Sequence, residues 1–194
     1  MPSGVEKLFQ PQELDIFFTS GRDFASCVFN RSSAVGFKRR RDYTVPTHTG
    51  FLTHEDGQWF CTELNEDGIE SDSSSKYIDV TRKNKSAFHS VYRWTGFSSD
   101  SVVEAVLQHL AALRQQDSGY DWFGAIRCNR FVRRFLPFIK ESKKKQYCSE
   151  NVFQMLKWKG LVGYPKKWDS HDPHPHFLNR FIAINGAFKL IWEA

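Results

Sequence analysis

The clearest alternation of hydrophobic and polar positions runs from residue 49 to residue 64. Side chains alternate through residues 49–53, the sequence Glu55-Asp56-Gly57 follows, and residues 59–64 are again rich in aromatic and β-branched side chains. An Asp-Gly pair between two such segments is the usual signature of a tight β-hairpin turn. The pattern therefore predicts a hairpin in which residue 50 lies opposite residue 62 or 63.

Shorter apolar segments predict further strands elsewhere in the chain. Candidates are residues 13–21 ("ELDIFFTSG"), 76–82 ("KYIDVTR") and 86–94 ("SAFHSVYRW"). The polar segment 65–75 between them reads as a loop. The C-terminal "FIAINGAFKLIWEA" is interpreted as a second hairpin that turns at Asn185-Gly186.

Helical spacing appears in two places, and more weakly at residues 27–35. The sequence Ser101-Val102-Val103-Glu104 fits a capping box, and the predicted helix after it ends near residues 118–119. Its expected apolar face comprises Val103, Val106, Leu107, Leu110 and Ala111. A second helix is predicted from Asn151 to Lys159, with Gly160 as its terminating residue. Strands early in the chain and helices later indicate an α+β fold with an antiparallel sheet.

Composition indicates an ordinary globular protein. The chain has 194 residues, 25% of them charged, which suits a single domain over residues 1–194. The four cysteines form no Cys-x-x-Cys pair and are too sparse for a disulfide scaffold, so reduced thiols are expected. No signal peptide and no long apolar segment is evident, so a cytoplasmic location is expected, with leaderless export or delivery left open.

The net charge of +5 is unevenly distributed. Residues 37–41 form one basic run, and residues 127–145 hold eight basic residues against one acidic residue. Such segments attract an anionic polymer such as cell wall, a membrane surface or nucleic acid. Nucleic-acid binding is the alternative function, because three phenylalanines are interleaved with the basic residues (Phe131, Phe135 and Phe138). Their helical spacing equally fits a hydrophobic core.

Candidate chemistry begins at Cys148, which stands where the second helix is expected to start. It lies four residues before Val152, so it shares the apolar face of that helix. The positive end of the helix dipole favours a thiolate, the reactive form of cysteine. A small, inert and buried side chain is the competing interpretation.

A nucleophilic cysteine needs a base and a group that orients the base. Of the seven histidines, His48 is the strongest candidate, because it opens the predicted hairpin beside Gly50, which permits close approach of another group. The returning strand brings Glu63 near the same position. A carboxylate beside an imidazole holds its tautomer and stabilises its charged form.

Five motifs occur in the order "DIFFTSG", "THTGFL", "FCTELNEDGI", "GYDWFG" and "QYCSENV". In this order and spacing the chain resembles the circularly permuted branch of the NlpC-type papain-like cysteine hydrolases. The resemblance implies a papain-like, circularly permuted α+β fold with the nucleophile helix packed against the sheet. It implies Cys148 as nucleophile, His48 as base and Glu63 as the orienting group.

The same resemblance assigns structural roles to Asp15 and to Tyr120-Asp121. The chain departs from the family pattern at the basic insert 37–41 and at Asn151, where the family has an apolar residue. The third residue of the site, which Glu63 matches, varies in the family.

The function implied is that of a thiol hydrolase, a cysteine amidase, peptidase or acyl hydrolase. It would act on an amide bond of the cell-wall (peptidoglycan) peptide type or on an acyl ester, and no cofactor is expected. A catalytically degenerate papain-like binding domain is a further alternative. A metal site is another, because His171, Asp172, His174 and His176 lie close together in a segment interpreted as a loop.

Overall fold

The computed structural model describes most of the chain, in segments. The described residues are 5–21, 46–65, 68–74, 77, 86–95, 100–115, 121, 125, 147–158 and 174–194. The predicted helix at 27–35 and the basic segments 37–41 and 127–145 lie outside the described residues, as do the phenylalanines of the second basic segment.

One antiparallel sheet of six strands organises the described residues, in the order β4-β3-β2-β1-β5-β6. Its strands are β1 (Ile16–Gly21), β2 (His48–Glu55), β3 (Gln58–Asn65), β4 (Gly68–Ser73), β5 (Ser86–Trp94) and β6 (Phe188–Glu193). The structure confirms the predicted α+β class with an antiparallel sheet.

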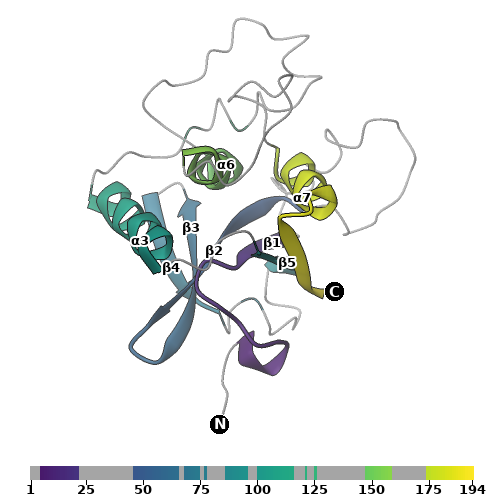
Figure 1. Cartoon of the computed structure of the whole chain (residues 1–194), viewed down its shortest axis with the longest axis horizontal. Coiled ribbons are helices and arrows are strands. Elements are labelled where there is room, and N and C mark those ends of the chain that lie inside the picture. The colour runs from purple at the N-terminus through teal and green to yellow at the C-terminus, as the bar shows by residue number, and fades with distance from the viewer. Residues whose placement is uncertain are drawn as a thin grey trace, which may run out of the picture.

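Three α-helices lie on one side of this sheet (Figure 1). They are α3 (Asp100–Gln115), α6 (Cys148–Trp158) and α7 (Pro175–Ile184), while the short 3₁₀ helix η1 (Val5–Lys7) lies on the other side. Within the described part of the chain, no helix is both long and apolar enough to cross a membrane.

Each face of the sheet has its own hydrophobic core. On the helical side, Phe18, Phe51 and Leu64 pack with Val152 and Phe153 of α6. On the opposite side, Phe17, Leu52, Cys61 and Phe88 pack with Tyr77. Successive residues of β1 thus enter opposite cores, as the two-residue period of a strand requires.

The β2–β3 hairpin has the turn that its sequence predicts. Asp56 and Gly57 have φ angles of 48° and 77°, the left-handed values that a type I′ turn needs at both central positions. The turn pairs Glu55 with Gln58 and, five pairs further on, Gly50 with Glu63. The predicted pairing of residue 50 with 62 or 63 is therefore confirmed.

The prediction of a loop over 65–75 is wrong, because residues 68–73 form β4. This strand is polar since it lies at the edge of the sheet and needs only β3 as a partner, with Ile69 supplying its main apolar contact. In the predicted strand 76–82, only Tyr77 is described, and it is helical instead of extended.

The predicted C-terminal hairpin is also wrong. Residues 175–184 form α7, which buries Leu178, Phe181 and Ile182 at helical spacing, and β6 pairs with β5. Part of the segment interpreted as a Pro- and His-rich loop belongs to this helix. Pro175 opens it, because a proline in the first turn loses no helical hydrogen bond.

Helix α3 differs from its prediction at its start. It begins at Asp100, before the proposed capping residue Ser101, and its predicted end near residues 118–119 lies outside the described residues. Val106 and Leu110 are buried as expected. Ala111 is exposed, so its assignment to the apolar face is wrong.

His174 caps the N-terminus of α7 with its ring. Its side chain is 1% exposed, and Nδ1 accepts a hydrogen bond of 3.1 Å from the backbone N–H of His176. Burial, and then the charge of His176, lower the pKa of His174 from 6.5 to about 4. The unfolded chain therefore takes up this proton at a higher pH than the folded protein does.

This difference predicts a loss of stability in acid. The contribution of His174 to the free energy of unfolding is complete above pH 6.5 and falls as the pH drops toward 4. The variant His174→Asn keeps a capping acceptor but does not titrate. Between pH 7 and pH 4.5 we expect its free energy of unfolding to fall by about 2 kcal/mol less than that of the wild type. Urea denaturation at the two pH values measures this free energy, and His54→Asn, at an exposed histidine, is the control. Equal losses in wild type and His174→Asn would contradict the assignment.

Candidate active site

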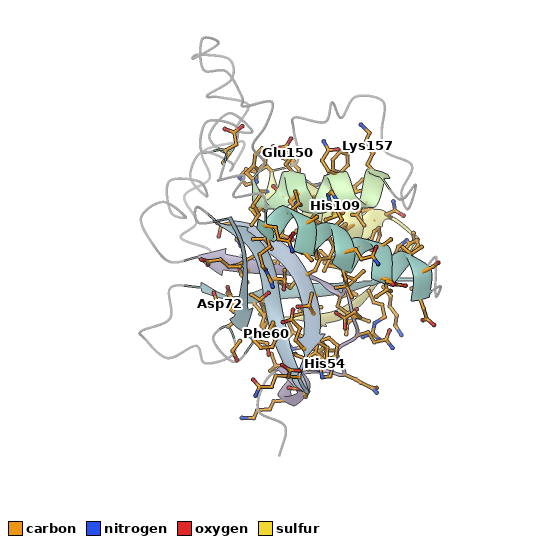
Figure 2. All side chains as sticks on the ribbon, turned by 90° about the vertical axis from the view of Figure 1, so that its left-hand side faces the viewer. His54, Phe60, Asp72, His109, Glu150 and Lys157 are labelled. Carbon is orange, nitrogen blue, oxygen red and sulfur yellow. The ribbon has the colours of Figure 1, made fainter. Side chains whose placement is uncertain are left out.

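Cys148 is the first residue of α6, which begins three residues before the predicted start at Asn151. Its side chain is 3% exposed, and Val152, Met155 and Leu156 of the same helix are buried. Glu150 and Lys157 lie on the side of α6 that faces away from the sheet (Figure 2). The apolar face of α6 packs on β2 and β3, which brings the start of the helix to the strands that carry the other site residues.

His48 is the first residue of β2, directly across from Thr19 of β1. Its side chain is 22% exposed, so the imidazole lies at the border between the interior and solvent. The ring atom Nε2 is 3.0 Å from Oε2 of Glu63, whose side chain is 6% exposed. The structure thus brings together the predicted base and its predicted orienting group.

Gly50 is what allows β2 and β3 to approach at this point. A Cβ atom at residue 50 would contact the backbone oxygen of Thr62 and would lie 2.9 Å from Cζ of Phe17 and 3.0 Å from Cβ of Glu63. Real side chains do not accept such distances. The group whose close approach Gly50 permits is therefore strand β3, which carries Glu63.

The electrostatics of His48 connect it to Cys148. Burial alone would lower the pKa of His48, but the negative charges and hydrogen bonds of Cys148 and Glu63 outweigh it and hold this pKa well above 6.5. Because Nε2 faces Glu63, the ring nitrogen Nδ1 is the one available to Cys148. This arrangement favours a thiolate beside an imidazolium.

Tyr77 completes the surroundings of Glu63, and sequence reasoning missed it. Its hydroxyl donates a 2.8 Å hydrogen bond to Oε1 of Glu63, so each carboxylate oxygen has its own partner. The Tyr77 ring packs against Phe17 and Phe88 in the second core. Burial and the charge of Glu63 raise the pKa of Tyr77, so the phenol stays protonated and remains a donor. Its position within a predicted strand gave no sign of this role.

Asp15 has the structural role expected from its motif. Its carboxylate accepts hydrogen bonds of 2.9 and 2.8 Å from Nε and a terminal nitrogen of Arg93 and one from the backbone N–H of Gln12. It is 1% exposed. Asp121 is buried too, whereas Tyr120 lies outside the described residues. Asn151, the departure from the family pattern, is buried in α6.

The proposed metal ligands have different places. His174 uses Nδ1 as a helix cap, His176 is in α7, and His171 and Asp172 lie outside the described residues. Among the residues that the structure describes, no group of three or more His, Cys, Asp or Glu side chains is arranged to hold a metal ion. Within the same residues, neither Cys61 nor Cys148 forms a disulfide.

Comparison with known proteins identifies a similar fold. No protein-family model matches the chain, and no curated protein matches its sequence. A solved structure, described as that of the DUF1105 metalloprotein yiiX from Escherichia coli O157:H7, is similar with a TM-score of 0.55. Its sequence identity is 18%, and the similarity covers 96% of this chain and 99% of that one. At this identity the likeness concerns the fold.

The geometry predicts that Cys148 is the most reactive thiol near neutral pH. At pH 7 we expect limiting iodoacetamide to label Cys148 ahead of the other cysteines. An ordinary cysteine, with a pKa of about 8.5, is mostly protonated at this pH, whereas a neighbouring imidazolium favours the thiolate of Cys148. His48→Ala should slow this labelling, since it removes the imidazolium, whereas His54→Ala should not. Peptide mapping by mass spectrometry measures the order. Preferential labelling of Cys61, or no effect of His48→Ala, would count against a thiolate–imidazolium pair.

A second prediction concerns the hydrogen bond to Glu63. Tyr77→Phe keeps the ring but removes a donor to a charged acceptor, so we expect the free energy of unfolding to fall by about 1.5–3 kcal/mol. Tyr92→Phe is the matched control. Its hydroxyl donates a longer, 3.4 Å hydrogen bond to the neutral amide of Asn179, so a loss nearer about 1 kcal/mol is expected. Chemical denaturation compares the two, and an equal or smaller loss in Tyr77→Phe would contradict the charged hydrogen bond.

Proposed function

We propose that the protein is a thiol hydrolase in which Cys148 is the nucleophile, His48 the base and Glu63 the orienting group. The observation that carries this proposal is the 3.0 Å contact between His48 and Glu63, on an imidazole whose pKa the charge of Cys148 also raises. The proposed base lies in β2, the orienting group in β3, and the nucleophile at the N-terminus of α6. That arrangement is the geometric requirement for an activated nucleophile.

In the first step, the Cys148 thiolate attacks the carbonyl carbon of an amide or ester. The new bond joins sulfur to carbon, and the carbonyl oxygen becomes an oxyanion. Cys148 opens α6, so this oxygen develops its charge at the positive end of the helix dipole, which would stabilise the oxyanion.

In the following steps, the His48 imidazolium gives its proton to the leaving amine or alcohol as the carbon bond to it breaks. This leaves a thioester on Cys148. His48, neutral again, takes a proton from water, whose oxygen attacks the thioester. The acid product leaves and the thiolate–imidazolium pair returns. Throughout, Glu63 keeps Nε2 occupied, which directs the other ring nitrogen to the proton in transit.

The papain-like, permuted form of the fold belongs to this proposal. Its support is the chain order His48, Glu63, Cys148 combined with a nucleophile helix that packs on β2 and β3. The resemblance in motifs includes enzymes for cell-wall peptide amides and for acyl esters. Both bond types suit the same thiol chemistry, so an activity test includes both.

Two alternative functions, a metal-dependent protein and a nucleic-acid-binding protein, are tested in the same experiment. The protein of similar fold is described as a metalloprotein, so metal content is measured alongside activity. The proposed mechanism needs no metal, and activity is therefore expected to survive extensive treatment with a chelator. Binding of DNA by the purified chain, without hydrolysis of any substrate, would favour the nucleic-acid alternative.

The test compares site variants on an acyl ester and on a peptidoglycan peptide amide. We expect Cys148→Ala to abolish hydrolysis, and Glu63→Gln to leave measurable activity, because an orienting group forms no bond to the substrate. Asp72→Asn, a change in the edge strand β4, is the control and should keep full activity. Activity that persists in Cys148→Ala would overturn the proposal, and complete loss in a folded Glu63→Gln would make Glu63 indispensable.

A further inference from the structure

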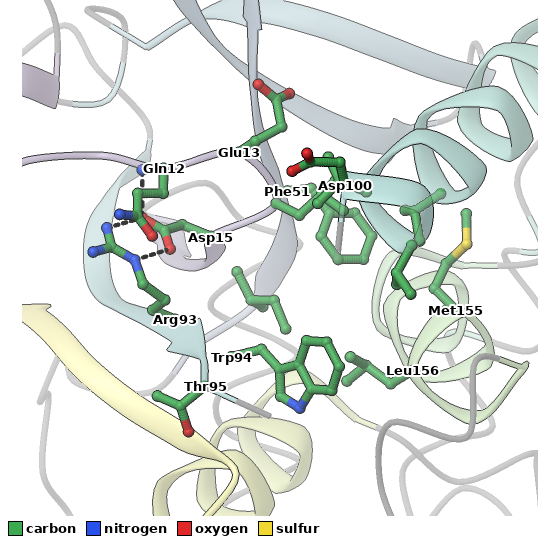
Figure 3. Close-up of a pocket in the computed structure, with 15 residues that line it drawn as sticks. Gln12, Glu13, Asp15, Phe51, Arg93, Trp94, Thr95, Asp100, Met155 and Leu156 are labelled. Atoms are coloured by element: carbon green, nitrogen blue, oxygen red, sulfur yellow. Dashed lines mark hydrogen bonds and ion pairs between the residues drawn. The ribbon is translucent and has the colours of Figure 1, made fainter. Parts of the chain in front are cut away.

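A pocket of about 350 Å³ contains Met155 and Leu156 of α6 in its lining (Figure 3). It is lined by the segment before β1, the end of β5, the start of α3 and the second half of α6. Its volume falls within the range of about 300–1,000 Å³ that is typical of small-molecule sites. Met155 and Leu156 line it, seven and eight residues after Cys148, so roughly 10 Å of helix separates the pocket from the thiol.

The floor of the pocket is apolar and its rim is polar. Buried side chains of Ile16, Phe51, Val106 and Met155 form the floor, and the half-buried Trp94 adds a second aromatic ring to the wall. The exposed residues of the lining are polar, among them Asp100. A molecule that fits must therefore present an apolar body inward and a polar group outward.

The charge at the rim identifies that polar group. Glu13, Asp15 and Asp100 line the pocket together with one basic residue, Arg93. Arg93 is occupied by its two hydrogen bonds to Asp15, so these two charges cancel. Glu13 and Asp100 remain, and Figure 3 shows their carboxylates on the same side of the pocket. A chain with a net charge of +5 thus has a locally negative pocket.

Each of the two carboxylates is suited to a cation. One oxygen of Glu13, Oε1, accepts the backbone N–H of His54 at 3.1 Å, which fixes the side chain while leaving Oε2 for a ligand. Burial raises the pKa of Glu13, and a cation beside it would favour the ionised carboxylate. Asp100 opens α3 and is exposed, so its carboxylate is accessible at the rim.

We infer that this pocket is a second binding site, and that it takes an organic ammonium ion with an apolar body. The ammonium group would pair with Glu13 and Asp100 at the rim, and the apolar body would lie against the aromatic rings of Trp94 and Phe51. The apolar body would cover the floor formed by β1, α3 and α6. Carboxylates combined with aromatic rings and aliphatic side chains select an ammonium amphiphile over a neutral or an anionic one.

The sequence supplies a reporter inside the pocket. The chain holds two methionines, Met1 and Met155, so labelling of methionine methyl groups gives one NMR signal from the pocket and one from the N-terminus. Phenethylammonium is the probe, and 2-phenylethanol and phenylacetate are its neutral and anionic counterparts. All three are titrated into the full-length chain at low and high salt.

We expect the Met155 signal to shift and saturate with phenethylammonium while the Met1 signal stays in place. Binding should be at least about tenfold tighter than that of 2-phenylethanol, undetectable for phenylacetate, and weaker at high salt. Glu13→Gln should remove most of the preference for the ammonium ion. Glu104→Gln is the matched control, because Glu104 is an exposed residue of α3 that does not line the pocket.

Two further variants separate this site from the proposed catalytic one. Cys148→Ala should leave phenethylammonium binding unchanged, whether or not the chain hydrolyses any substrate. Val103→Phe, which fills the pocket, should abolish binding of both phenethylammonium and 2-phenylethanol. Equal affinity for phenethylammonium and 2-phenylethanol, or an unchanged affinity in a folded Glu13→Gln, would overturn the inference, and so would an absence of any Met155 shift.

Discussion

The contact between the backbones of β2 and β3 at Gly50 is the constraint on which the rest of the site depends. Only a residue without a side chain lets β3 approach this closely, and the approach sets Glu63 beside Gly50. His48, two residues earlier on β2, then finds a carboxylate 3.0 Å from its ring. A larger residue at position 50 would push apart the two strands that form the pair.

The sheet supports this pair from both of its faces. On the helical side, the apolar face of α6 carries Cys148 to the imidazole. On the opposite side, Tyr77 is packed between Phe17 and Phe88 and donates a hydrogen bond to Glu63. Burying a carboxylate is costly unless its oxygens are paired. The second core is thus a source of polar support for the site, in addition to being a source of stability.

The two ends of α6 present different chemistry. Its first residue is the thiol, next to an imidazole whose pKa is raised by two negative neighbours. Its second half lines an apolar pocket whose rim holds Glu13 and Asp100. The same helix can serve both because its buried face is continuous, whereas the charged groups belong to the elements packed at either end. A ligand in the pocket would therefore contact the element that also positions Cys148.

The sequence by itself determined the features that depend on local chemistry: the turn at Asp56-Gly57, the register that follows from it, and the presence of a helix directly after Tyr147 and Cys148. Counting from the turn was sufficient to place Glu63 near His48. The tertiary structure alone decided that residues 68–73 form a strand, because a polar edge strand is stabilised by its neighbour and not by its own pattern. It also decided the partner of Glu63, since Tyr77 reaches the carboxylate only through packing in the second core, and no local spacing encodes a contact between such separate segments.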